Sequence, residues 1–347
     1  MDKELTINIT AGTIIKALAL IVLAGALWYL RDLVLIVLIS IVIGSAVDPA
    51  ARSLAKYKIP RTLSISVVYL AFFASFFVVM YFFVPPVLKE ASGLITTLPT
   101  SVHTLESNAN STLGIPFIDS FSLSSAVNEL NGLFTGLTED AFAMINVVFG
   151  GLISFVLVVV FSFYFAVNER GIEDFLRVVT PLKSEKHVVD LWHRSQKKIG
   201  LWLQGQLLLG LIVGVLVYLG LTILGIEYAL VLAVLAALLE LIPVFGPILA
   251  MVPAVALGFS SGGFALAGAV FVFYIIIQQF ENNLIYPLVV TKVVGVPPLL
   301  VILALIIGAK LAGIIGILLS IPMAAIVQEL FADMDKSRRA ALKKQNA

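Results

Sequence analysis

Long runs of apolar residues alternate along the chain with short polar or charged connections. Four of the runs contain no charged residue: 62–84, 141–167, 205–225 and 264–280. A helix of about 20 apolar residues crosses the roughly 30 Å hydrocarbon core of a bilayer. Each run therefore predicts a membrane helix, although the last is slightly short for a perpendicular crossing.

An N-terminal pair of apolar runs, 13–30 and 33–47, is separated by Arg31 and Asp32. Each half is long enough to cross with some tilt, and the whole could also be one long bent helix. We favour two crossings.

Two further apolar segments, 229–259 and 298–331, are interrupted by glycine and proline. Their halves have about 10 to 18 residues, mostly too few to cross a membrane alone. Helical hairpins that enter and leave on one side would explain this length, and a single kinked crossing for each segment is the alternative. The pattern predicts an all-α polytopic membrane protein with about eight membrane segments, including two broken, re-entrant hairpins.

The composition supports the membrane interpretation and excludes several kinds of functional site. Apolar residues make up 60% of the 347 residues and charged residues 12%, whereas soluble domains are about 25% charged. The chain has no cysteine, which excludes disulfides and thiolate metal sites. No nucleophile–base set, phosphate loop, metal cluster or nucleic-acid motif is visible, so we expect no enzyme activity, no cofactor, no metal and no nucleic-acid partner.

The distribution of Lys and Arg predicts the orientation. Segments 48–61, 168–204 and 332–347 are basic, whereas 85–140 holds Lys89 and six acidic residues. Basic loops stay in the cytoplasm, so we place the first three inside, with both termini, and 85–140 outside as a small cap of short helices.

The segment 184–204 has the spacing of an amphipathic helix. Its predicted apolar face consists of Val188, Trp192, Ser195, Ile199 and Trp202. We expect it to lie on the membrane surface or to pack against a neighbouring helix, with His187 and His193 in solvent.

These observations divide the chain into six parts. They are N-terminal membrane helices (1–84), the external cap (85–140), a membrane helix (141–167), cytoplasmic amphipathic helices (168–204), a C-terminal transport core (205–331) and a basic tail (332–347).

The string LLELIPVFGPILAMVPA in the transport core places Glu240 beside Pro243 and Pro247. Proline breaks or kinks a helix, and irregular backbone at membrane depth is tolerated where it is buried in protein or lines a wet cavity. A carboxylate in an apolar span is a functional candidate by default. A structural pair between Glu240 and Lys310, or a bond to a free backbone amide, is the alternative.

A second polar group ends the apolar run 264–280. It comprises Gln278, Gln279, Glu281, Asn282 and Asn283, and Gln278, Glu281 and Asn282 share one helix face. Amide and carboxylate oxygens suit a hydrated solute or a hard cation. The alternative is a polar helix end at the membrane surface before Pro287.

The motifs of this region resemble the autoinducer-2 exporter family of permeases, most specifically over residues 200–328. The family pattern E-x-x-P-x-x-G-P is matched by Glu240, Pro243, Gly246 and Pro247, and Q-x-x-E-x-N by Gln278, Glu281 and Asn283. The chain departs from the family at Asn282, where glycine is frequent, and at Ala309-Lys310, where Gly-Gly is frequent.

This resemblance implies a multi-pass inner-membrane protein of a prokaryote that assembles as a homo-oligomer, a pentamer in described members. It leaves the cargo open, because some members are linked to export of autoinducer-2 and others to exchange of sodium or lithium for protons.

We therefore expect a secondary transporter or permease that exports a small polar solute similar to autoinducer-2. The alternatives are an antiporter of Na⁺ or Li⁺ against protons, with Glu240 and Glu281 as its carboxylates, and a passive oligomeric pore or scaffold. The residues expected along the solute or ion pathway are Glu240, Pro243, Gly246, Pro247, Gln278, Glu281, Asn282, Asn283 and Lys310.

Overall fold

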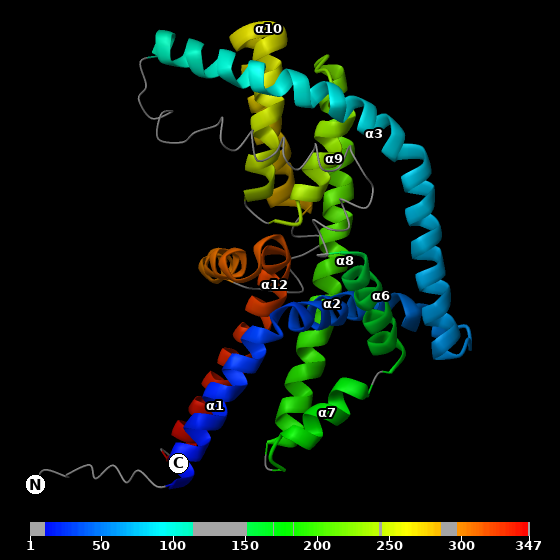
Figure 1. The fold of residues 1–347 in the computed structure, drawn as a ribbon, viewed down its shortest axis with the longest axis vertical. Coiled ribbons are helices and arrows are strands. Elements are labelled where there is room, and N and C mark those ends of the chain that lie inside the picture. The colour runs from blue at the N-terminus through cyan, green and yellow to red at the C-terminus, as the bar shows by residue number, and fades with distance from the viewer. Residues whose placement is uncertain are drawn as a thin grey trace, which may run out of the picture.

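The computed structural model describes residues 11–113, 151–168, 170–182, 184–242, 245–285 and 297–345. Regular structure in these ranges is entirely helical (Figure 1). The elements are α1 (Ala11–Tyr29), α2 (Arg31–Ala55), α3 (Arg61–Leu113), α6 (Leu152–Val167), α7 (Gly171–Val179), α8 (Glu185–Ile223), α9 (Ala229–Leu239), α10 (Phe245–Phe280), the π-helical turn η1 (Glu281–Ile285) and α12 (Pro298–Gln345). The all-α prediction is confirmed.

Within the described ranges, five helices are long and apolar enough to cross a membrane, or six if the bent pair of α6 and α7 forms one span. A multi-pass α-helical membrane fold is therefore confirmed, and the total of eight segments stays a prediction. The break expected at Arg31 and Asp32 lies at Leu30, where α1 ends and α2 begins.

Helix α8 runs through the middle of the molecule and is crossed by α2 (Figure 1). The segment 184–204 is helical and packs against other helices, one of the two arrangements expected, but it continues without a break into the following apolar run as one helix. Ser195, Ile199 and Trp202 of its predicted apolar face are buried. At the crossing, a side chain at Gly200 would collide with the Ser45 carbonyl oxygen, so glycine permits the close approach.

Helix α3 continues far beyond its apolar run. Residues 85–113 extend it, in place of the short helices predicted for this part of the cap, and α3 curves across one end of the molecule (Figure 1). Ala91 and Leu94 are buried there, and Glu90 accepts a hydrogen bond from the Val231 amide at 3.1 Å. This carboxylate caps the N-terminal turn of α9. The rest of the cap, 114–140, lies outside the described residues.

The chain reverses inside α12, as predicted for 298–331. Ala312 and Gly313 leave helical geometry, and Gly313 has φ +56°, a conformation that glycine adopts at no steric cost. The Ser320 hydroxyl donates to the Ala304 carbonyl at 2.9 Å across the two limbs. The limbs therefore form an antiparallel hairpin.

Helix α10 contains a second reversal, at Gly262 and Gly263. Its first limb packs closely on the second, since a Cβ at Gly258 would lie 3.2 Å from Val270 Cγ2. The run 264–280, predicted as a membrane helix, forms the second limb of a hairpin. The predicted break after Glu240 is confirmed, because α9 ends at Leu239 and α10 begins at Phe245.

Candidate functional site

The two candidate carboxyl groups of the transport core meet inside the protein. Glu240 follows the last turn of α9, Glu281 opens η1, and their side chains lie close enough to interact. Glu240 is 2% exposed and Glu281 is 5% exposed. A hydrogen bond between two carboxyl groups needs a proton, because an ionised carboxylate only accepts. Two carboxyl groups this close therefore favour a proton held between them over two negative charges.

Helix α8 supports the pair from the side. Gln206 is buried and donates from Nε2 to the backbone carbonyl of Glu240. The helices approach closely, since a Cβ at Gly210 would lie 2.7 Å from the Ala237 carbonyl oxygen. The Gln206 amide thus satisfies a carbonyl that the helix break leaves without an intrahelical partner.

The second limb of α10 supplies further polar groups. Gln278 Nε2 lies 3.1 Å from Glu281 Oε2 and 3.4 Å from Asn282 Oδ1. Tyr274 is buried one turn earlier, on the same helix face as Gln278 and Glu281 by its spacing. Glu281 also begins a π-helical turn, a local geometry that is frequent at functional sites.

Three oxygens at or near the pair are buried without a hydrogen-bond partner in the described part of the chain: Gln206 Oε1, Glu240 Oε2 and the Tyr274 hydroxyl. A buried polar group without a partner costs roughly 1–3 kcal/mol. These oxygens can accept hydrogen bonds from hydroxyl groups or contact a monovalent cation. No group of three or more His, Asp or Glu that could hold a metal occurs within the described ranges.

Two of the remaining predicted site residues, Gly246 and Pro247, lie at the turn between α9 and α10, next to Glu240. A side chain at Gly246 would collide with the Leu239 carbonyl oxygen, so this glycine permits the tight turn between α9 and α10. Pro247 lies beside it in the first turn of α10, where proline needs no intrahelical donor. Pro243 lies outside the described residues.

Asn283 and Lys310 lie apart from the pair. Asn283 is exposed and donates back to the Gln279 carbonyl at 2.8 Å. Lys310 is exposed on the first limb of α12. The alternative of a structural pair between Glu240 and Lys310 is wrong, because no such ion pair occurs among the described residues, in which Glu240 contacts Glu281 instead.

Gln206 and Tyr274 are site residues that the sequence patterns did not predict. Gln206 is the one amide inside the charge-free run 205–225, and that isolation was a usable signal. Tyr274 gave no comparable signal, because a tyrosine within an aromatic-rich membrane helix is ordinary.

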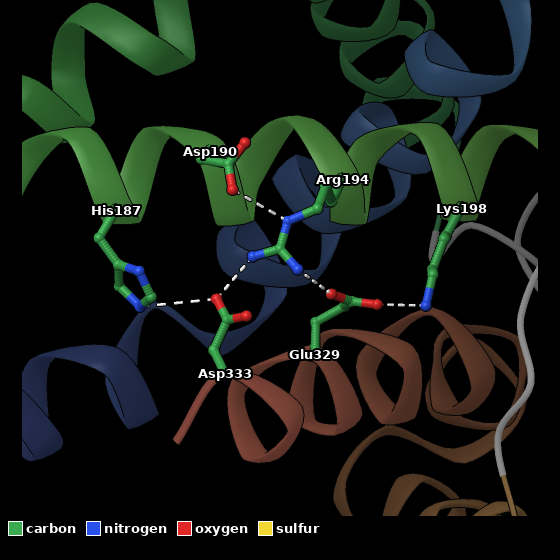
Figure 2. Close-up of polar contacts among 6 residues, drawn as sticks. All are labelled: His187, Asp190, Arg194, Lys198, Glu329 and Asp333. Carbon is green, nitrogen blue, oxygen red and sulfur yellow. Dashed lines mark hydrogen bonds and ion pairs between the residues drawn. The ribbon is translucent and has the colours of Figure 1, made fainter. Parts of the chain in front are cut away.

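A second polar cluster joins α8 to the second limb of α12 (Figure 2). The Arg194 guanidinium lies between Glu329, with Nη1–Oε2 at 2.6 Å, and Asp333, with Nη2–Oδ2 at 2.5 Å. Asp190 contacts the same guanidinium at 3.1 Å, and Lys198 pairs with the other oxygen of Glu329. Because both acids of α12 are buried, loss of their cationic partners would leave buried negative charge without compensation.

The two histidines lie at the edge of this region. Both are exposed, as expected, and each nevertheless contacts an acid: His187 Nε2 lies 3.5 Å from Asp333 Oδ2, and His193 Nε2 lies 3.3 Å from Glu173 Oε2. One helix, α8, thus contributes to both clusters: Gln206 contacts the backbone of Glu240, and Arg194 contacts the α12 hairpin.

Comparison with known proteins finds one family and several relatives. A family model described as AI-2E family transporter matches residues 17–336. The presumed transport protein YueF of Bacillus subtilis is 27% identical over 297 residues, which is 83% of this chain and 80% of YueF. The AI-2 transport protein TqsA of Escherichia coli is 33% identical over 117 residues, 34% of each chain.

Proposed function

Because the chain belongs to the AI-2E transporter family, we propose that it is a secondary transporter that exports a small polar solute, with autoinducer-2 as the first candidate. The name of TqsA supports this cargo. The single observation that carries the mechanism is the buried pair of Glu240 and Glu281.

The shared proton couples the pair to conformation. Loss of the proton leaves two negative charges side by side, and charges about 4 Å apart repel by about 4 kcal/mol at an effective dielectric constant of about 20. Glu240 lies between α9 and α10, and Glu281 lies at the end of α10. Deprotonation therefore drives the two helix ends apart.

The polar groups around the pair suit a hydroxylated cargo. Gln278 and Asn282 supply amide groups beside Glu281, while Gln206 Oε1 and Glu240 Oε2 are acceptors. Hydroxyl groups of a solute would satisfy these atoms when the carboxyl pair separates. Protonation would restore the bond between the two glutamates and release the solute.

Exchange of a monovalent cation against protons is the second candidate, favoured by the same pair. A sodium ion can take the place of the shared proton, because carboxylate and amide oxygens are ligands for hard cations. The two candidates differ in which species crosses the membrane.

Flux in proteoliposomes tests the proposal. Purified protein is reconstituted, a pH gradient is imposed, and fluxes of autoinducer-2 and sodium are measured in parallel. We expect gradient-dependent autoinducer-2 flux that is lost in Glu281→Gln and kept in Glu227→Gln, a matched change at an exposed glutamate. Sodium-for-proton exchange without autoinducer-2 flux would overturn the proposal in favour of the antiporter, and flux of neither would overturn both.

We further propose an inner-membrane location with both termini in the cytoplasm, and a homo-oligomeric, pentameric assembly. The positive-inside pattern supports the first, and the family resemblance supports the second. Accessibility of single cysteines introduced near each terminus tests the orientation, and native mass spectrometry tests the assembly.

A further inference from the structure

Helix α7 turns its polar side toward the protein. Glu173 contacts Arg177 at 2.5 Å on its own helix and His193 of α8 at 3.3 Å. Arg177 also reaches Glu185 in the first turn of α8 at 3.4 Å. The contacts between α7 and α8 are thus partly ionic.

The opposite side of α7 is apolar and exposed. Phe175 is 65% exposed, Val178 86%, and Leu182, just beyond the helix end, 88%. Within α7, Phe175, Val178 and Val179 lie on one face of the helix, because they are three and four residues apart. An amphipathic helix of a water-soluble protein packs this face against the core, so α7 has the reverse arrangement.

The position of α7 indicates what covers this face. Helix α6 is an apolar span, and α7 follows it after a bend of 85°. With α6 across the bilayer, α7 lies nearly parallel to the membrane plane, at the depth where α6 ends. Tyr164, in the last turn of α6, is exposed and accepts a hydrogen bond from Asn168 at 3.3 Å. Tyrosine at this depth is typical of the membrane–water interface.

We propose that α7 is an interfacial lipid-binding helix. Phe175, Val178, Val179 and Leu182 insert at the boundary between headgroups and acyl chains, as in membrane-surface helices. Arg170, exposed just before α7, is placed to contact anionic headgroups. The polar face remains bound to α8, so α7 lies between the lipid and the helix that carries Gln206 and Arg194.

Because the chain has no cysteine, one introduced thiol can report on each position. The variants Val178→Cys and, as the matched control, Lys186→Cys are labelled with an environment-sensitive fluorophore. Each full-length protein is reconstituted into vesicles of phosphatidylethanolamine and phosphatidylglycerol. Quenching is measured with nitroxide-bearing lipid and with aqueous iodide.

We expect the label at position 178 to be quenched several-fold more by the lipid-borne nitroxide, and several-fold less by iodide, than the label at 186. Equal access of iodide to both labels would overturn the proposal. Protection of position 178 from both quenchers would also overturn it, because a second copy or another part of this chain would then cover the face. The readout is independent of transport, so it does not depend on the proposed function.

Discussion

Arg194 of α8 and Asp333 of α12 are 139 positions apart in sequence, and their side chains meet at 2.5 Å. The carboxylates of Asp333 and Glu329 both contact the Arg194 guanidinium (Figure 2). The contact holds the second limb of the α12 hairpin against the central helix.

Arg194→Ala removes the guanidinium that contacts both buried carboxylates, and leaves Glu329 with Lys198 and Asp333 with His187. Breaking a fully buried ion pair costs about 3–5 kcal/mol, and because Arg194 is itself partly exposed we expect about 2–3 kcal/mol. The melting temperature of the detergent-solubilised protein, followed by intrinsic tryptophan fluorescence, should fall by several degrees. Lys197→Ala, an exposed neighbour outside the cluster, is the control, and equal melting temperatures of the two variants would contradict the assignment.

Glu240→Gln should remove the pH dependence of transport. The glutamine amide can donate to Glu281 whether or not a proton is available, so the bond between the two side chains no longer opens when the pH rises. We expect slow flux that stays constant across the pH range in which the wild-type rate changes. An unaltered pH profile would exclude the shared proton from the mechanism, and Glu227→Gln again provides the control.

Gly246→Ala should impair transport without preventing membrane insertion. A methyl group there meets the Leu239 carbonyl oxygen, and overpacking of this kind costs about 1–3 kcal/mol. Gly268→Ala is the matched control, because a Cβ at Gly268 meets no atom within 4 Å. Wild-type flux in both variants would remove the turn between α9 and α10 from the mechanism.

Acidification should loosen the contact between α7 and α8. The hydrogen bond from Arg177 lowers the pKa of Glu173 below its ordinary value of 4.5. A lowered pKa in the folded protein means that the stabilisation by charged Glu173, first through Arg177 of its own helix and then through His193 of α8, is full above 4.5 and is lost as the pH falls through the lowered value. Fluorescence energy transfer between labels at Asp174→Cys and Lys186→Cys should decrease over that range, and Glu173→Gln should abolish this pH dependence.

The sequence predicted those features that neighbouring residues determine. The break after Glu240 and the reversal near Gly313 were predictable because proline and glycine act on the backbone where they stand. The continuity of α8 from residue 185 to residue 223 was not predictable from the sequence. The change from an amphipathic to a fully apolar pattern near residue 205 resembled a boundary, although nothing there interrupts the backbone hydrogen bonds of the helix.

The contact between Glu240 and Glu281 also could not be predicted from the sequence. Both residues were candidates, but their contact depends on the reversal at Gly262 and Gly263, which lies between them. Arg194, Glu329 and Asp333 were missed for a related reason. Periodicity identifies the faces of single helices and does not pair helices that are more than a hundred residues apart.

In the α12 hairpin, Gly308 and Gly316 bring two backbones into direct contact, and a side chain at either would collide with the carbonyl oxygen of the other. Interlocked backbones of this kind cannot slide past one another in small steps, because no flexible side chain lies between them to rearrange. The two limbs of the hairpin therefore move together as one rigid unit. The Arg194 cluster joins the second limb of this unit to α8, so a displacement of the hairpin is transmitted to the central helix.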